Sequence, residues 1–176
     1  MVNYKQPVIP VLVLIVYIVA AESLVLNFLP GVSVLFCCPT AWLTHVVTGW
    51  PLSMNDSVYV LETPAIILRI TEKCSGFSFF LTLHGVILLA LAFKNLRLMF
   101  ISILPVLAAS YVMAILLNVC RVMCSYQLKN LLPDGFIIPY AGIHLFIGAM
   151  IFIPFLIFAF IITSKFKNSR KLEARS

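Results

Sequence analysis

The sequence predicts an all-α fold, a polytopic bundle of transmembrane helices in one integral membrane domain that covers residues 1–176. Of its residues, 62% are hydrophobic and only 10% are charged, whereas a soluble domain averages about 25% charged residues because its surface must face water. Four stretches are apolar over roughly the 20 residues that a helix needs to cross a bilayer. The net charge of +6 comes mostly from short basic segments beside these stretches, which is typical of membrane topology rather than of nucleic-acid binding.

The four predicted spans follow one another without a repeat or a low-complexity linker that would divide the chain. They are Val8–Phe28, Phe77–Phe93, Leu98–Leu117 and Ala141–Thr163, followed by a basic tail over 164–176. No small-residue cleavage site closes the first span, so we expect a membrane anchor rather than a removed signal peptide.

Between the first two spans, the segment Gly31–Trp50 is apolar but is interrupted by Pro39, by three threonines and by His45. We expect an interfacial or partly re-entrant helix here, with Trp42 and Trp50 at the depth of the lipid headgroups. If the segment crossed the bilayer instead, the N-terminus would move to the outer side and the later spans would keep their orientation.

Two outer loops should connect the remaining elements. The first covers residues 51–73, where alternation along 66–71 gives a weak strand signal that leads into Cys74. The second covers residues 118–140 and contains a turn at 133–135, where Pro, Asp and Gly follow one another.

Basic residues predict the orientation of the bundle. Lys94 and Arg97 lie in the turn between the second and third spans, five more basic residues crowd the tail, and Lys5 precedes the first span. Because basic residues in short loops favour the cytoplasmic side, all of them lie on that side if the chain crosses four times. We therefore expect a cytoplasmic C-terminus.

This topology brings three chemically useful residues to the outer ends of three different spans. Cys74 lies just before the second span, Arg121 one turn beyond the third, and His144 about one turn inside the fourth. A cation or an imidazole nearby raises the reactive thiolate fraction of a cysteine. An imidazole can take the thiol proton and return it to a leaving amine, and a guanidinium can stabilise the oxyanion of a tetrahedral intermediate. Together they describe acyl transfer through a thioester.

The same residues can also be explained by structural roles instead of catalysis. A cysteine at the membrane border is most often inert packing, and Arg121 could anchor a helix end to headgroups. His144 is harder to explain by packing, because polar groups within spans usually face a cavity or a partner. Asn118 and Arg121 are three residues apart and share a helix face. Two polar residues at this spacing are also found at the end of an ordinary helix.

Other residues compete for these roles. His84 lies ten residues after Cys74, about 15 Å along a helix, so we expect a hydrogen bond within the bundle for it; His45 is the second candidate for the base. Cys124 is the competing nucleophile. Vicinal cysteines at 37–38 could hold a metal or oxidise, but packing is the favoured interpretation. Glu22 is a carboxylate within the first span that could line the site.

Three short segments resemble the signature blocks of the exosortase/archaeosortase family of membrane cysteine transpeptidases. They are the ExCSG stretch at 72–76, the NxxR stretch at 118–121 and the HxxxG stretch at 144–148. The resemblance covers roughly residues 40–163, and the short chain is most similar to the compact exosortase K type. It adds a set of supporting site residues: Glu72, Ser75, Gly76, Asn118 and Gly148.

The resemblance implies that Cys74 is the nucleophile, Arg121 the transition-state stabiliser and His144 the proton-transfer residue. It implies substrates that are exported proteins with a C-terminal sorting signal, made of a short motif, a transmembrane helix and a basic tail. Cleavage would occur at the periplasmic or extracellular face of a prokaryotic cell (inner) membrane. The acyl group would pass to an acceptor amine or to water, with membrane lipids as surroundings and no cofactor.

Two functions of other classes remain as alternatives. A small transporter or channel component would use intramembrane polar groups such as Glu22 and His84 as a pathway. A non-enzymatic membrane assembly protein would use the spans only for packing, and would tolerate substitutions at Cys74, Arg121 and His144 equally.

Overall fold

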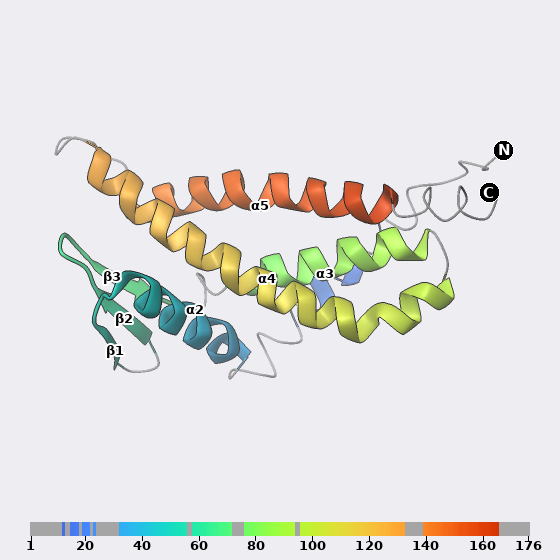
Figure 1. The fold of residues 1–176 in the computed structure, drawn as a ribbon, viewed down its shortest axis with the longest axis horizontal. Helices are drawn as coiled ribbons and strands as arrows, with labels where there is room; N and C mark the ends of the chain where they lie inside the picture. Colours follow the sequence, from blue (N-terminus) through green and yellow to red (C-terminus); the bar gives the residue numbers. More distant parts are fainter. Residues whose placement is uncertain are drawn as a thin grey trace, which may run out of the picture.

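The computed structural model describes residues 12, 15–17, 19–21, 23, 32–55, 58–71, 76–93, 96–132 and 139–165. These residues are mostly helical (Figure 1). The helices are α2 Val32–Thr48, α3 Phe77–Ala92, α4 Leu96–Leu131 and α5 Tyr140–Lys165, and the strands are β1 Leu52–Asn55, β2 Val58–Glu62 and β3 Ile67–Ile70. The described residues between 12 and 23 are helical as well.

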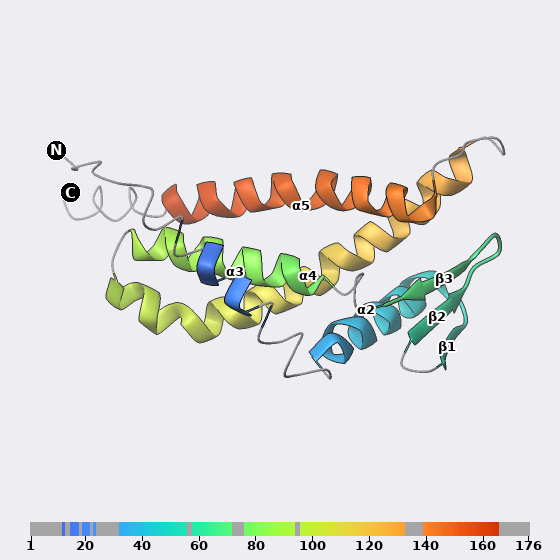
Figure 2. The same ribbon diagram turned by 180° about the vertical axis from the view of Figure 1, so that it is seen from behind.

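Helices α3, α4 and α5 pack against one another as a bundle (Figures 1 and 2). Aromatic rings fill the space between them, and the ring of Phe79 on α3 stacks on Phe152 of α5 with centroids 4.1 Å apart. Ala21 packs against the same cluster, and the hydroxyl of Tyr17 lies 2.8 Å from Nδ1 of His84 on α3. Two described residues of the first predicted span, Tyr17 and Ala21, therefore lie against this part of the bundle.

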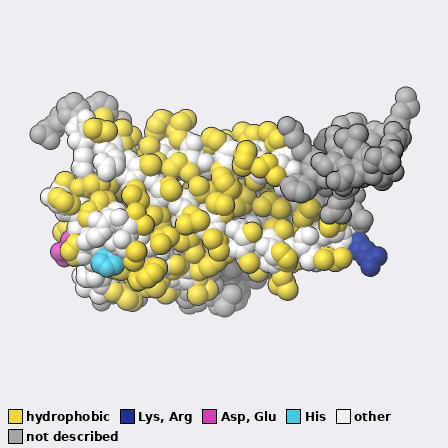
Figure 3. Space-filling model, in the orientation of Figure 1, with side chains coloured by type: hydrophobic (Ala, Val, Ile, Leu, Met, Phe, Trp, Pro, Cys, Tyr) yellow, Lys and Arg dark blue, Asp and Glu magenta, His cyan; other side chains and the backbone are white. Residues whose placement is uncertain are grey.

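Within the part of the chain that the structure describes, two helices, α4 and α5, are long and apolar enough to cross a membrane. Only 17% of the most apolar stretch of α4 and 6% of that of α5 is buried inside the protein, and hydrophobic side chains cover much of the face seen in Figure 3. A core helix of a soluble domain would instead bury such side chains. Helix α3 is apolar but has 16 residues, fewer than a helix normally needs to span a bilayer.

The predicted fold class is confirmed in part: the described residues are mostly helical, but those between 51 and 71 form three strands where a loop was expected. They form an antiparallel sheet in the order β1-β2-β3, and the weak strand signal before Cys74 is confirmed by β3. The sheet places Tyr59, Leu61, Leu68 and Ile70 on one face, where they form a core with residues of α2 and α4. Burial of these apolar residues explains why the segment is ordered as strands.

The predicted outer loop over 118–140 is also wrong in its first half. Helix α4 continues to Leu131 and is 36 residues long. Residues 118–131 contain neither Gly nor Pro, and Val122 and Tyr126 bury themselves against α2 and the sheet. This packing stabilises a helix that continues past the apolar stretch. The predicted turn at 133–135 lies outside the described residues.

The helix predicted within Gly31–Trp50 is confirmed as α2, which contains Pro39 and packs against α4 and the sheet. Its two tryptophans differ in environment. Trp42 is 57% exposed, whereas Trp50 packs edge-on against Tyr126 with ring centroids 4.6 Å apart. Trp50 therefore belongs to the packed region around the sheet.

Candidate active site

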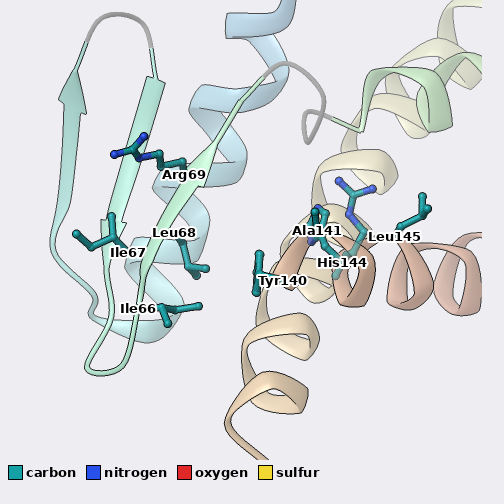
Figure 4. A pocket seen from close by; sticks show the side chains of 9 residues that line it. Ile66, Ile67, Leu68, Arg69, Tyr140, Ala141, His144 and Leu145 are labelled. Atoms are coloured by element: carbon teal, nitrogen blue, oxygen red, sulfur yellow. The ribbon is translucent and has the colours of Figure 1, made fainter. Parts of the chain in front are cut away.

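A pocket of about 670 Å³ lies between β3 and the first turns of α5 (Figure 4). Its walls combine apolar side chains with the guanidinium of Arg121 and the imidazole of His144. The lining residues are Ile66, Ile67, Leu68, Arg69, Arg121, Tyr140, Ala141, His144 and Leu145. Two of the three residues that the sequence analysis selected for chemistry, Arg121 and His144, thus share one pocket.

Arg121 reaches this pocket from α4 and is held closely by α5. Its side chain is only 9% exposed, and its guanidinium carbon lies 5.1 Å from the centre of the Phe152 ring, within cation–π distance. Gly148 lies beside the same side chain, and a Cβ at position 148 would be 3.0 Å from Cδ of Arg121. The absence of a side chain at 148 therefore leaves the space that Arg121 occupies.

His144 lies about one turn into α5 and is 9% exposed. Its Nδ1 is 3.2 Å from Oγ of Ser125 on α4. The Ser125 hydroxyl donates to the backbone oxygen of Arg121 at 2.6 Å, so its single proton is already used. Nδ1 of His144 must then donate to Ser125, and this assigns the proton of a neutral imidazole to Nδ1.

The other ring nitrogen of His144, Nε2, is left as a proton acceptor by this tautomer. It is buried and has no hydrogen-bond partner among the described residues. The ring itself is held by stacking on Tyr140, with centroids 5.9 Å apart. The imidazole is therefore oriented from two sides and keeps one nitrogen available.

Gly76 and Asn118 join the segment around residue 76 to α4. Gly76 has a φ of 77°, in the left-handed region that favours glycine. A Cβ at this position would lie 3.4 Å from Cβ of Asn118. Asn118 is fully buried, and its Nδ2 donates to Oγ1 of Thr40 on α2 at 3.4 Å. The start of α3 is thus packed against α4 one turn before Arg121.

Four of the predicted site residues lie outside the described residues: Cys74, Glu72, Ser75 and Glu22. The five others, Gly76, Asn118, Arg121, His144 and Gly148, lie in two contacting sets. Asn118 contacts Gly76, and Arg121 contacts Gly148. Ser125 connects the backbone of Arg121 to His144.

The competing residues lie elsewhere. Nδ1 of His45 is 2.6 Å from the backbone oxygen of Trp50, at the end of α2. His84 forms the hydrogen bond within the bundle that we expected, with Tyr17, and its ring stacks on Phe80. Cys124 is exposed on α4 and is not among the residues that line the pocket.

The vicinal cysteines have different environments, since Cys37 is buried and Cys38 is exposed. Among the described residues, no group of three His, Cys, Asp or Glu side chains could hold a metal ion. Neither cysteine lines the pocket between β3 and α5.

Sequence reasoning missed two residues of this site, Ser125 and Arg69. Ser125 follows Arg121 by four residues, a spacing that places both on one helix face, but it fell in a segment predicted as a loop. Arg69 lies within the weak strand signal over 66–71, and nothing in the sequence links it to Arg121 or His144. Its position in β3 brings it to the wall of the pocket.

Comparisons with known proteins identified no relative of this chain. No family model, no curated protein and no solved structure matches the chain. The function is therefore inferred from the residues of the site and from their geometry.

Proposed function

We propose that the protein is a membrane-embedded cysteine peptidase or transpeptidase of the exosortase type, which cleaves C-terminal sorting signals of exported proteins. One observation carries the proposal: described residues of three segments that resemble the family's signature blocks lie next to one another, and two of them, Arg121 and His144, line one pocket. Gly76 contacts Asn118, Arg121 contacts Gly148, and Ser125 connects Arg121 to His144. Packing of unrelated helices gives no reason for these particular residues to meet.

Cys74 is the proposed nucleophile. It precedes Gly76 by two residues, and two peptide units extend at most about 7 Å. The chain therefore tethers Cys74 close to Gly76, which itself contacts Asn118 one helical turn before Arg121. This tether supports a common site for the thiol, the guanidinium and the imidazole.

In the proposed acylation step, Nε2 of His144 takes the proton of the Cys74 thiol, and the sulfur attacks the scissile carbonyl carbon. Arg121 stabilises the negative oxygen of the tetrahedral intermediate. The carbon–nitrogen bond then breaks, and the imidazolium returns its proton to the leaving amine. The products are a thioester on Cys74 and the released C-terminal helix of the substrate.

In the second step, an acceptor amine or water attacks the thioester, with the same imidazole as the base. The carbon–sulfur bond breaks, and the thiolate regains a proton from the imidazolium. An amine gives transfer and water gives hydrolysis. No metal or organic cofactor takes part in this scheme.

The proposed placement has four spans in a prokaryotic cell membrane, with the pocket at the outer face. Helix α4 is about 54 Å long at 1.5 Å per residue, well beyond the ~30 Å apolar layer of a bilayer. Its Arg121 half lies near the sheet, at the end of the molecule opposite the junction of α3 and α4 (Figure 1). Arg97 marks that junction, which favours the cytoplasmic side.

The direct test is alkylation by a membrane-impermeant maleimide added to intact cells, with variants that keep a single cysteine. We expect the Cys74-only protein to be labelled from outside, and faster than the Cys124-only protein, because a nearby cation and imidazole favour the reactive thiolate. Cys124 is the matched control, since it is exposed on the Arg121 half of α4. Labelling of Cys74 only after the cells are opened would contradict the proposed orientation.

Replacement of Gly148 by Ala should reduce activity without destabilising the protein. Alanine favours a helix interior over glycine by up to about 1 kcal/mol. The new methyl group would lie 3.0 Å from Cδ of Arg121, whose guanidinium carbon lies 5.1 Å from the centre of the Phe152 ring on the same helix as Gly148. We expect thioester formation to slow about ten- to a hundredfold, because small displacements of catalytic groups have effects of this size.

The Gly148→Ala measurement is the rate of thioester formation on Cys74 by intact-protein mass spectrometry, together with the melting temperature in detergent. Ala149→Ser is the control on the exposed face of α5. Equal rates in both variants would argue against a role for the position of Arg121.

A further inference from the structure

Strand β3 forms one wall of the pocket and is also an edge of its sheet. Among the described strands the order is β1-β2-β3, so β3 pairs with β2 along one side only. Its residues Ile66 to Arg69 line the pocket opposite Arg121 and His144, and Figure 4 shows the strand facing the first turns of α5 across this space.

The hydrogen-bond pattern shows which backbone groups of β3 are unused by β2. The N–H of Thr63 donates to the oxygen of Ile66, so this closing pair of the hairpin is hydrogen-bonded. Hydrogen-bonded and non-hydrogen-bonded pairs alternate along an antiparallel ladder. The pairs of Ile67 with Glu62 and of Arg69 with Val60 are therefore of the second kind.

The N–H and C=O groups of Ile67 and Arg69 consequently point away from β2. The bond from Glu62 N–H to the oxygen of Pro51 agrees with this pattern, because it directs Glu62 towards β1. Two donor–acceptor pairs thus stand on the free edge of β3, about 6.8 Å apart at two residues of strand rise.

We propose that this edge binds the substrate polypeptide as an added, extended strand, so that the cleaved segment lies between β3 and the Arg121–His144 pair. This inference rests on the proposed peptidase function and specifies how it recognises its substrate. An extended backbone is the ligand whose donors and acceptors repeat at the spacing of Ile67 and Arg69. Such pairing recognises main-chain groups, and the pocket walls then select the side chains.

The charges of the pocket restrict which part of a substrate binds there. Both charged residues among the described residues of the lining, Arg121 and Arg69, are basic, and none of these described lining residues is Asp or Glu. Of the two, the guanidinium of Arg69 points away from α5 (Figure 4). A lysine-rich or arginine-rich segment would be repelled. The bound segment is therefore a neutral or acidic stretch that precedes the membrane helix of the substrate, and not its basic tail.

The test uses proline on the free edge, because proline removes one N–H and is tolerated at sheet edges. Ile67→Pro removes a donor that faces the pocket and keeps the hydrogen bonds to β2. Met54→Pro is the matched control on β1: by the same alternation from the Pro51–Glu62 bond, Met54 faces the other edge of the sheet, and its side chain is 58% exposed.

The readout is the fraction of the full-length protein that carries a hydroxylamine-sensitive acyl group on Cys74 in its native membrane. We expect Ile67→Pro to lower this fraction at least about tenfold, and Met54→Pro to leave it unchanged. Equal fractions in the two variants would overturn strand addition. If the wild-type protein forms no acyl group on Cys74, that result contradicts the proposed peptidase function itself.

Amide hydrogen exchange of the wild-type protein, free in detergent, avoids any problem with folding of the variants. The amides of Ile67 and Arg69 should exchange fast, while those of Leu68 and Ile70, which face β2, should be protected. Protection of Ile67 and Arg69 at all protein concentrations would mean that the edge is already covered. Protection that grows with concentration would assign the edge to a second copy of the chain, and either result would overturn the inference.

Discussion

A Cys74→Ala variant is expected to leave substrates uncleaved, with their C-terminal membrane helix still attached, because no other group in the proposed site can form the thioester. Removal of a catalytic nucleophile lowers turnover on the order of 10⁶-fold in a comparable acyl-transfer site. The substitution keeps Cβ and removes only the sulfur of the side chain. The measurement is mass spectrometry of exported membrane proteins from cells that carry only the variant.

The controls for this variant are Cys120→Ala and Cys124→Ala, because both cysteines are exposed on α4 near Arg121. Substrates should be processed normally in each of them. Trapping of a thioester-linked partner on Cys74 of the wild-type protein would identify the substrate directly. Normal processing in the Cys74→Ala variant would remove the enzymatic interpretation and leave the transporter and assembly alternatives.

The helical part of the fold was predictable because long apolar stretches specify helices wherever their backbone must satisfy its own hydrogen bonds. The bounds of α3 and α5 agree with the predicted spans within a few residues. The sheet was not predictable in full, since its strands have only four or five residues and depend on packing against α2 and α4. Such tertiary packing leaves little periodicity in the sequence.

The C-terminal half of α4 was missed for a related reason. Hydropathy ends the predicted span at Leu117, but a helix need not end where the membrane does. The side chains of Val122 and Tyr126 bury against the sheet and extend the helix to Leu131. This error concealed Ser125, since its relation to Arg121 exists only if both residues lie on one helix.

The candidate site was predictable in one respect, the position of each residue along its helix. Arg121 and His144 were expected at one end of the bundle, and both line the same pocket. What sequence could not supply was the orientation of each group. The Ser125 hydroxyl donates its hydrogen bond to the backbone oxygen of Arg121, so Nδ1 of His144 must carry the proton that it shares with Ser125. This relation exists only in the folded chain.

The second large effect is expected for His144→Asn, a substitution that distinguishes the roles of the two imidazole nitrogens. The amide nitrogen of asparagine occupies nearly the position of Nδ1 and keeps a donor for Ser125, which lies 3.2 Å from Nδ1. Nε2 is lost, and with it the proposed proton acceptor. General acid–base catalysis typically contributes 10²–10⁴-fold, so thioester formation on Cys74 should slow by roughly this factor while the melting temperature stays nearly unchanged.

Ser125→Ala is the informative companion to His144→Asn, because it keeps Nε2 and removes only the acceptor that orients the ring. The buried Nδ1–H is then left without its bond, which destabilises this arrangement by about 1–3 kcal/mol, and Ser125→Thr should restore it by keeping a hydroxyl group. We expect a loss of rate in Ser125→Ala that is smaller than in His144→Asn. If His144→Asn were as active as the wild-type protein, His144 would be a packing residue, and the contact with Ser125 would be part of the helix interface alone.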